Sequence, residues 1–102
     1  MGAQVFFRTS SGKTAREAFD EAVRRACHEH GHSGYTGSMA EKEGFVMIPL
    51  PHGEEAPSFA NRLIDDDDER IDDKWGPAGC IQFDVDSETG RKQFLFFGWA
   101  SS

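Results

Sequence analysis

Residues 80–99 read CIQFDVDSETGRKQFLFFGW, and this segment predicts a β-hairpin. Apolar and polar residues alternate in its first half, where Ile81, Phe83 and Val85 share one face of a half-buried strand. The letters SETG supply the turn. Residues 94–97 are apolar on both faces, which is typical of a strand in the centre of a sheet. We therefore expect an antiparallel strand pair whose second strand is central.

A helix upstream of the hairpin is the most clearly patterned element. Its apolar residues recur at the helical period and form one stripe, which consists of Ala15, Ala18, Phe19, Ala22, Val23 and Ala26. Thr14 and Glu17 have the spacing of a capping box, which marks the start of the helix. Gly31 is a natural stop. The alanines on the stripe predict close packing of this helix on a sheet.

The remaining elements complete an α+β order. The residue pattern predicts a first strand over 4–8, a weak strand over 36–40 and a firmer strand over 45–50. A second helix is expected from Pro57, which suits a first turn, to Ile71. We therefore predict an α+β two-layer sandwich with a mainly antiparallel sheet, two helices on one face and the order β-α-(β)β-α-β-β.

Length and composition indicate a single α+β domain over residues 1–102. A chain of this size buries roughly two-thirds of the surface that its unfolded form exposes. No segment reaches the ~20 apolar residues that cross a bilayer, so no membrane partner is expected. Cys27 and Cys80 lack any paired spacing, and we expect two unpaired thiols in a reducing compartment.

The net charge of −7 is confined to one segment. Residues 54–73 carry nine acidic residues against two arginines, whereas the rest of the chain is neutral. This charge disfavours direct binding of nucleic acid, which requires clustered lysine and arginine. A basic protein partner would suit it better, and the partner-binding candidates are Asp65, Asp66, Asp67, Asp68 and Trp75. The alternatives are a solvated helix end and a core position for the tryptophan.

A glycine-rich segment after the first helix is the leading candidate for a ligand site. Residues 28–44 read HEHGHSGYTGSMAEKEG, and glycines let the backbone approach a ligand where a side chain would block it. Backbone amides, hydroxyls, an aromatic face and a lysine can form a pocket for an anion or a nucleotide. The ligand-binding candidates are Gly34, Tyr35, Thr36, Gly37, Ser38, Glu41 and Lys42. The alternative is a structural loop in which the tyrosine covers the core.

Catalytic and metal-binding motifs are incomplete. Gly12-Lys13-Thr14 lacks the first glycine of a phosphate-binding loop, so its threonine is better explained as a helix cap. His28, His30 and His32 are a weak candidate metal site, because a glycine interrupts the helix between the last two. The aspartate run lacks the glycine and the ligand spacing of a calcium loop. We expect no cofactor, no bound metal and no catalytic residues.

Three segments are distinctive as sequence. They are GYTGSMAEK at 34–42, KWGPAGCI at 74–81 and FLFFGWAS at 94–101. Together they resemble a family of small uncharacterised proteins from tailed bacteriophages and bacterial genomes. The resemblance brings no assigned activity or ligand residues. It implies the cytoplasm of a bacterial host and an accessory role, and by analogy small acidic phage proteins are often inhibitors of host factors or defence systems.

The leading hypothesis is a non-enzymatic binding protein, a phage accessory factor that inhibits or sequesters a host component. One form binds a host protein through the acidic segment. The other binds a small polar ligand such as a nucleotide through residues 34–42, and a homo-oligomer would then deepen the pocket. The alternative is a metal-assisted hydrolase or nuclease that uses His28, His30 and His32 with a nearby glutamate, where the metal would activate a bound water.

Overall fold

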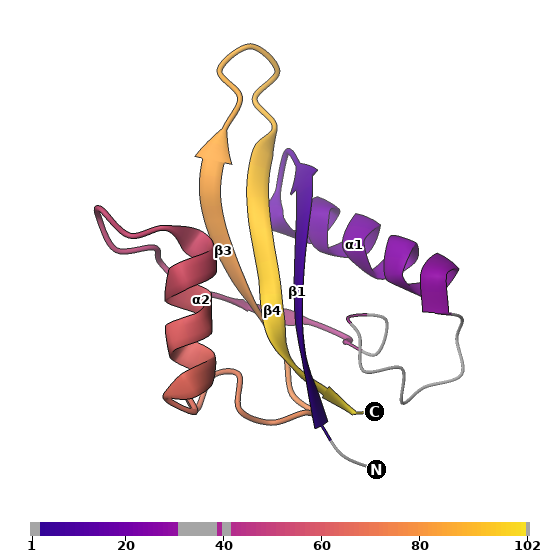
Figure 1. The fold of residues 1–102 in the computed structure, drawn as a ribbon. Coiled ribbons are helices and arrows are strands. Elements are labelled where there is room, and N and C mark those ends of the chain that lie inside the picture. The colour runs from indigo at the N-terminus through magenta and orange to yellow at the C-terminus, as the bar shows by residue number, and fades with distance from the viewer. Residues whose placement is uncertain (1–2, 31–38, 40–41, 102) are drawn as a thin grey trace.

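The computed structural model describes residues 3–30, 39 and 42–101. The elements follow in the order β1 (Ala3–Gly12), α1 (Ala15–His30), β2 (Phe45–Met47), α2 (Ala56–Asp65), β3 (Ala78–Val85) and β4 (Lys92–Ser101), as Figure 1 shows. This confirms the α+β class, and the predicted succession of the elements is matched in part. The weak strand expected over 36–40 lies outside the described residues, apart from the buried Met39.

The first helix begins as its capping pattern predicts. The backbone N–H of Glu17 donates to Thr14 Oγ1 at 3.1 Å, which satisfies one of the amides that a helix start leaves unpaired. The alanine stripe lies against the sheet, and Phe19 contacts the rings of Phe45 and Phe96 with centroids 5.0 and 5.7 Å apart. Small side chains on α1 thus bring the helix close to the sheet, as expected.

The second helix is shorter than predicted. It starts with Pro57 in its first turn, but it ends at Asp65, and Asp67 takes a left-handed conformation with φ +52°. Ile71 is nevertheless buried, because the chain folds back and its N–H donates to the carbonyl of Asp68 at 3.0 Å. A helix continued to residue 71 would bury Ile71, and so does the observed turn. The spacing of apolar residues therefore could not distinguish a longer helix from a helix followed by a turn. In the described part of the chain, neither helix is long and apolar enough to span a bilayer.

The sheet has four strands in the order β1-β4-β3-β2. As predicted, β4 is central: it pairs antiparallel with β1 over ten residues and antiparallel with β3. Between β3 and β4 the register shifts at Gln82 and Asp84, which marks a bulge. Strand β2 pairs parallel with β3. The sheet is therefore mixed rather than antiparallel throughout.

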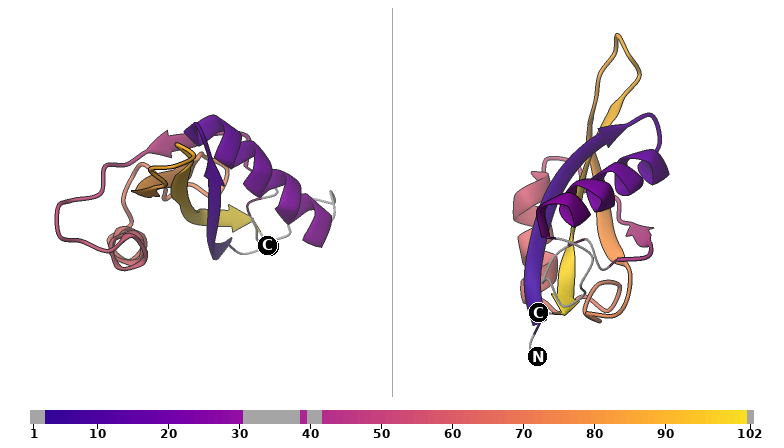
Figure 2. Two further views of the ribbon diagram at one scale, coloured as in Figure 1. Left: turned by 90° about the horizontal axis from the view of Figure 1, so that it is seen from above. Right: turned by 90° about the vertical axis from the view of Figure 1, so that its right-hand side faces the viewer.

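The two helices lie on opposite faces of the sheet, so the predicted two-layer arrangement with both helices on one face is wrong. Alternate residues of β4 separate the two cores. Phe94 and Phe96 pack in one cluster with α1, whereas Leu95 and Phe97 pack in the other with α2. Figure 2 shows the resulting three layers. A central strand that is apolar on both faces requires a cover on each face.

The chain path explains why the helices separate. The segment from β1 through α1 to β2 crosses the sheet in one direction, and the segment from β2 through α2 to β3 steps back in the other. Each crossover joins parallel strands, and such crossovers are almost always right-handed. Two crossovers of the same hand that run in opposite directions place their helices on opposite faces.

Candidate functional site

Most of the predicted ligand loop lies outside the described residues. These candidates are Gly34, Tyr35, Thr36, Gly37, Ser38 and Glu41. The described member is Lys42, whose side chain is buried with 5% of the residue exposed. Its ammonium group donates to the backbone carbonyls of Lys74 and Gly76 at 3.1 and 2.9 Å and lies 5.9 Å from the ring centre of Phe6. Lys42 thus joins the turn before β3 to the core, and a ligand role for this loop stays a prediction.

In the aspartate run at residues 65–68, all carboxylates but one are exposed to solvent. Asp65, Asp66 and Asp67 are exposed. Asp68 is bound by Arg70, whose Nε and Nη2 donate to its two oxygens, both at 2.9 Å. These hydrogen bonds, with one from the Arg70 backbone amide, lower the pKa of Asp68 from 3.8 to about 2. Asp68 therefore closes the turn, while the three preceding aspartates supply surface charge.

Trp75 lies on the surface, with 65% of the residue exposed. Its backbone N–H donates to Asp73 Oδ1 at 2.8 Å, and the ammonium of Lys74 lies 5.5 Å from the ring centre. A hollow of about 560 Å³ adjoins it, lined by Glu43, Gly44, Lys74, Trp75, Gly76 and Pro77. The core position considered for this tryptophan is wrong. Its side chain is placed where a partner could contact it.

Most of the candidate metal-binding histidines have side chains outside the described part of the chain. His28 is exposed on α1, the side chain of His30 is not described, and His32 lies outside the described residues. Within residues 3–30, 39 and 42–101, no group of three His, Cys, Asp or Glu could hold a metal ion. Both cysteines are free thiols, and burial raises the pKa of Cys80 to about 12. At neutral pH Cys80 is therefore an unreactive thiol.

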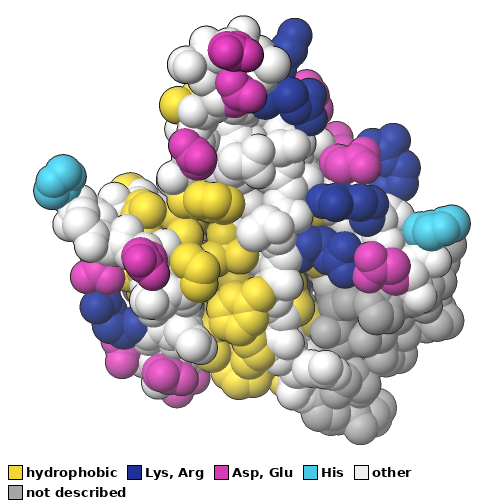
Figure 3. Space-filling model, turned by 45° about the horizontal axis from the view of Figure 1, so that its top comes forward, with side chains coloured by type: hydrophobic (Ala, Val, Ile, Leu, Met, Phe, Trp, Pro, Cys, Tyr) yellow, Lys and Arg dark blue, Asp and Glu magenta, His cyan; other side chains and the backbone are white. Residues whose placement is uncertain are grey.

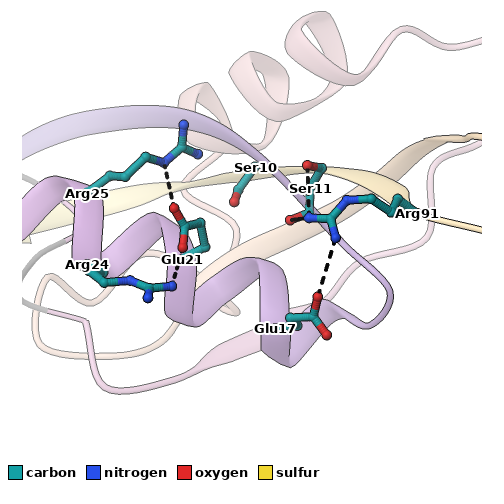
Figure 4. A pocket seen from close by; sticks show the side chains of 7 residues that line it. All are labelled: Ser10, Ser11, Glu17, Glu21, Arg24, Arg25 and Arg91. Atoms are coloured by element: carbon teal, nitrogen blue, oxygen red, sulfur yellow. Dashed lines mark hydrogen bonds and ion pairs between the residues drawn. The ribbon is translucent and has the colours of Figure 1, made fainter. Parts of the chain in front are cut away.

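A polar pocket of about 300 Å³ lies where α1 meets the end of β1. We name it the arginine–serine pocket; its lining residues are Ser10, Ser11, Glu17, Glu21, Arg24, Arg25 and Arg91. Figure 4 shows these side chains, which come from α1, from β1 and from the turn just before β4. The pocket thus joins residues that are far apart in the sequence.

Backbone carbonyls of β1 hold two of the three arginines in the pocket. Arg25 donates to the carbonyl of Thr9 at 3.0 Å, and Arg91 donates to the carbonyl of Ser11 at 3.1 Å. Edge strands turn alternate carbonyls away from their neighbour, so these two groups are available on the open side of β1. The arginine positions are therefore set by the strand.

Two glutamates of α1 lie among the arginines. Glu21 accepts a hydrogen bond from Arg24 and lies 3.9 Å from Nε of Arg25. Glu17 lies 3.7 Å from Nη1 of Arg91. Three guanidinium groups against two carboxylates leave the lining with a net positive charge, although the whole chain carries −7.

Ser10 is a buried polar residue at the base of this pocket. It is 4% exposed, and its Oγ has no hydrogen-bond partner among the described residues. Leaving a buried hydroxyl unpaired costs about 1–3 kcal/mol. Figure 4 shows the hydroxyl pointing toward α1. The pocket therefore contains one polar atom whose hydrogen bonding is incomplete.

Sequence reasoning did not find this pocket. Its serines and arginines belong to no motif with a fixed spacing. The available signal was the adjacent arginine pair on the polar side of an amphipathic helix. No model of a known protein family, no curated protein and no solved structure matches this chain.

Proposed function

We propose that this chain is a non-enzymatic binding protein, a phage accessory factor that inhibits or sequesters a host protein with a basic surface. The observation that carries this proposal is the exposure of Trp75 beside the acidic segment. Trp75 is the most exposed of the large hydrophobic residues in the described part of the chain. Tryptophan is enriched among the residues that dominate binding energies at protein interfaces.

The charge around Trp75 supports a partner with a basic surface. Residues 54–73 have a net charge of −7, and Asp72 and Asp73 are exposed immediately before the tryptophan turn. Figure 3 shows mostly acidic side chains near α2 on one side of a hydrophobic strip, and on the other side, toward α1, lysine and arginine side chains interspersed with acidic ones. A partner with exposed lysine or arginine around an apolar pocket complements the acidic side.

The proposal is tested by capture of partners from bacterial lysate, followed by binding measurements with the purified partner. We expect Trp75→Ala to weaken binding by at least about tenfold, because a central aromatic contact contributes about 2 kcal/mol or more. The double change Asp65→Lys and Asp66→Lys should lower the association rate at low salt. These two positions lie at the C-terminal end of α2, where lysine suits the helix dipole, so the fold should be retained.

The matched control changes net charge by the same amount elsewhere. Asp84→Lys with Glu88→Lys alters the exposed end of the β3–β4 hairpin. We expect this double variant to bind the partner with nearly the wild-type affinity. If both double variants reduce binding equally, net charge alone accounts for the effect, and the proposed surface is wrong. Binding that is indifferent to Trp75→Ala would also contradict it.

A further inference from the structure

The arginine–serine pocket contains hydrogen-bond donors that its carboxylates do not use. Each guanidinium has five N–H donors. Arg25 and Arg91 both direct one group to a carbonyl of β1, and their ion-pair distances of 3.9 Å to Glu21 and 3.7 Å to Glu17 exceed hydrogen-bond length. Both arginines therefore retain donors for another acceptor.

These donors are held in place before any ligand arrives. An arginine side chain that is anchored to backbone loses less freedom on binding than one that is loose in solvent. Arg25 extends from α1 and Arg91 from the turn just before β4, and both donate to carbonyls of the same strand, β1. The two guanidinium groups therefore flank one space from different directions.

The hydroxyl of Ser10 supplies a third point of contact. Ser10 is nine-tenths buried, lines the same pocket and has no partner for its Oγ among the described residues. A hydroxyl can donate to an anionic oxygen. An oxygen-rich anion in the pocket would complete the hydrogen bonding of Ser10 and of both anchored arginines together.

We propose that the arginine–serine pocket binds a small molecule through a phosphoryl group, with its oxygens on Arg25, Arg91 and the hydroxyl of Ser10. A phosphoryl group has three terminal oxygens in a tetrahedral arrangement, which suits donors from several directions. A planar carboxylate is satisfied by a single guanidinium fork. The two sites share no residue, because α1, β1 and the turn before β4 line the pocket, whereas the proposed protein-binding surface consists of the acidic segment and Trp75 with its adjoining hollow.

The size and charge of the pocket agree with a small ligand. Its volume of about 300 Å³ lies at the lower end of the range for small-molecule sites. The lining has three arginines against two glutamates, and the anion would replace part of the contact between Glu21 and Arg24 or Arg25. Binding of the anion should therefore affect only residues around this pocket, and its affinity should fall as the salt concentration rises.

The test uses the full chain and inorganic phosphate as the probe, with backbone and arginine side-chain N–H signals followed by NMR at constant ionic strength. We expect saturable shifts at Ser10, Ser11, Arg25 and Arg91. Arg91→Ala should weaken phosphate binding at least about tenfold, and Ser10→Ala should weaken it a few-fold. The matched control is Arg62→Ala, because Arg62 belongs to α2 and pairs with Glu54 outside the pocket. It should leave the phosphate affinity unchanged.

Acetate forms the second arm of the test. Acetate binding as tight as phosphate binding would show a general anion site and overturn the phosphoryl assignment. Shifts that do not saturate at Ser10 and Ser11, or an unchanged affinity in a folded Arg91→Ala variant, would overturn the site itself. If Arg91→Ala does not fold, Arg91→Lys takes its place: it retains the charge but loses the guanidinium fork, and an unchanged affinity there would equally reject the proposed contact.

Discussion

Among the four aspartates at residues 65–68, Asp68 forms an ion pair with an arginine of the same chain. Arg70 contacts both of its oxygens, and the hydrogen bonds hold the pKa of Asp68 at about 2 in the folded protein. A carboxyl group whose pKa is lower in the folded than in the unfolded state stabilises the fold above its unfolded pKa. That contribution is lost as pH falls from about 4 to about 2.

Replacement of the arginine should therefore change the acid limb of stability. In Arg70→Gln we expect the pKa of Asp68 to rise toward its ordinary value of 3.8, because the charged donors are gone. NMR titration of the Asp68 carboxyl carbon measures this shift, and denaturant unfolding across the same pH range should show a flatter dependence. Arg62→Gln is the control and should leave Asp68 unchanged. A pKa that remains near 2 without Arg70 would contradict the assignment.

Gly79 is a residue at which the absence of a side chain is required by packing. A Cβ at this position would lie 2.6 and 2.7 Å from ring atoms of Phe97 and 3.0 Å from Cγ2 of Ile71. We expect Gly79→Ala to lower the free energy of unfolding by about 1–3 kcal/mol, because the ring must move. Gly44→Ala is the control: its Cβ would meet nothing within 4 Å, and the change should stay within about 0.5 kcal/mol. Urea unfolding of both variants compares them directly.

At the scale of elements, β4 carries both cores. Phe96 is buried against α1 and Phe97 against α2. We expect Phe96→Ala and Phe97→Ala each to lower the free energy of unfolding by about 3–5 kcal/mol, because each leaves a cavity under a different helix. Phe83, at 40% exposure on the neighbouring strand, is the control and should cost far less. If one of the two β4 variants were nearly neutral, the helices could not cover both faces.

The sequence predicted element types better than element ends. The capping pair at Thr14 and Glu17 identified the start of α1 because the cap is a local hydrogen bond between neighbouring residues. The end of α2 was missed because Ile71 returns to the core through a turn at a helix-like spacing. The faces of the sheet were misassigned for a related reason: face assignment depends on the direction of crossovers, which only the strand order determines.

At the scale of the whole molecule, the candidate sites differ in how far apart their residues lie in the sequence. The acidic segment and Trp75 are adjacent in sequence, so charge and composition could identify them. The exposure of Trp75 could not be predicted, because it depends on the turn in which the N–H of Gly76 donates to the carbonyl of Asp73 at 2.9 Å. The arginine–serine pocket depends on pairing between β1 and β4, which brings Arg91 beside Ser11. No local pattern records such a juxtaposition.

The central position of β4 also has a consequence for biosynthesis. A ribosome makes β1, both helices, β2 and β3 before it makes β4, yet β4 lies between β1 and β3 and contributes to both cores. Until it emerges, β1 has no neighbouring strand and each helix lacks part of the surface on which it packs. Contacts between distant segments form slowly, and exposed apolar strands favour aggregation. The nascent chain should therefore expose aggregation-prone surface until β4 has emerged, and the sheet should assemble only after that point.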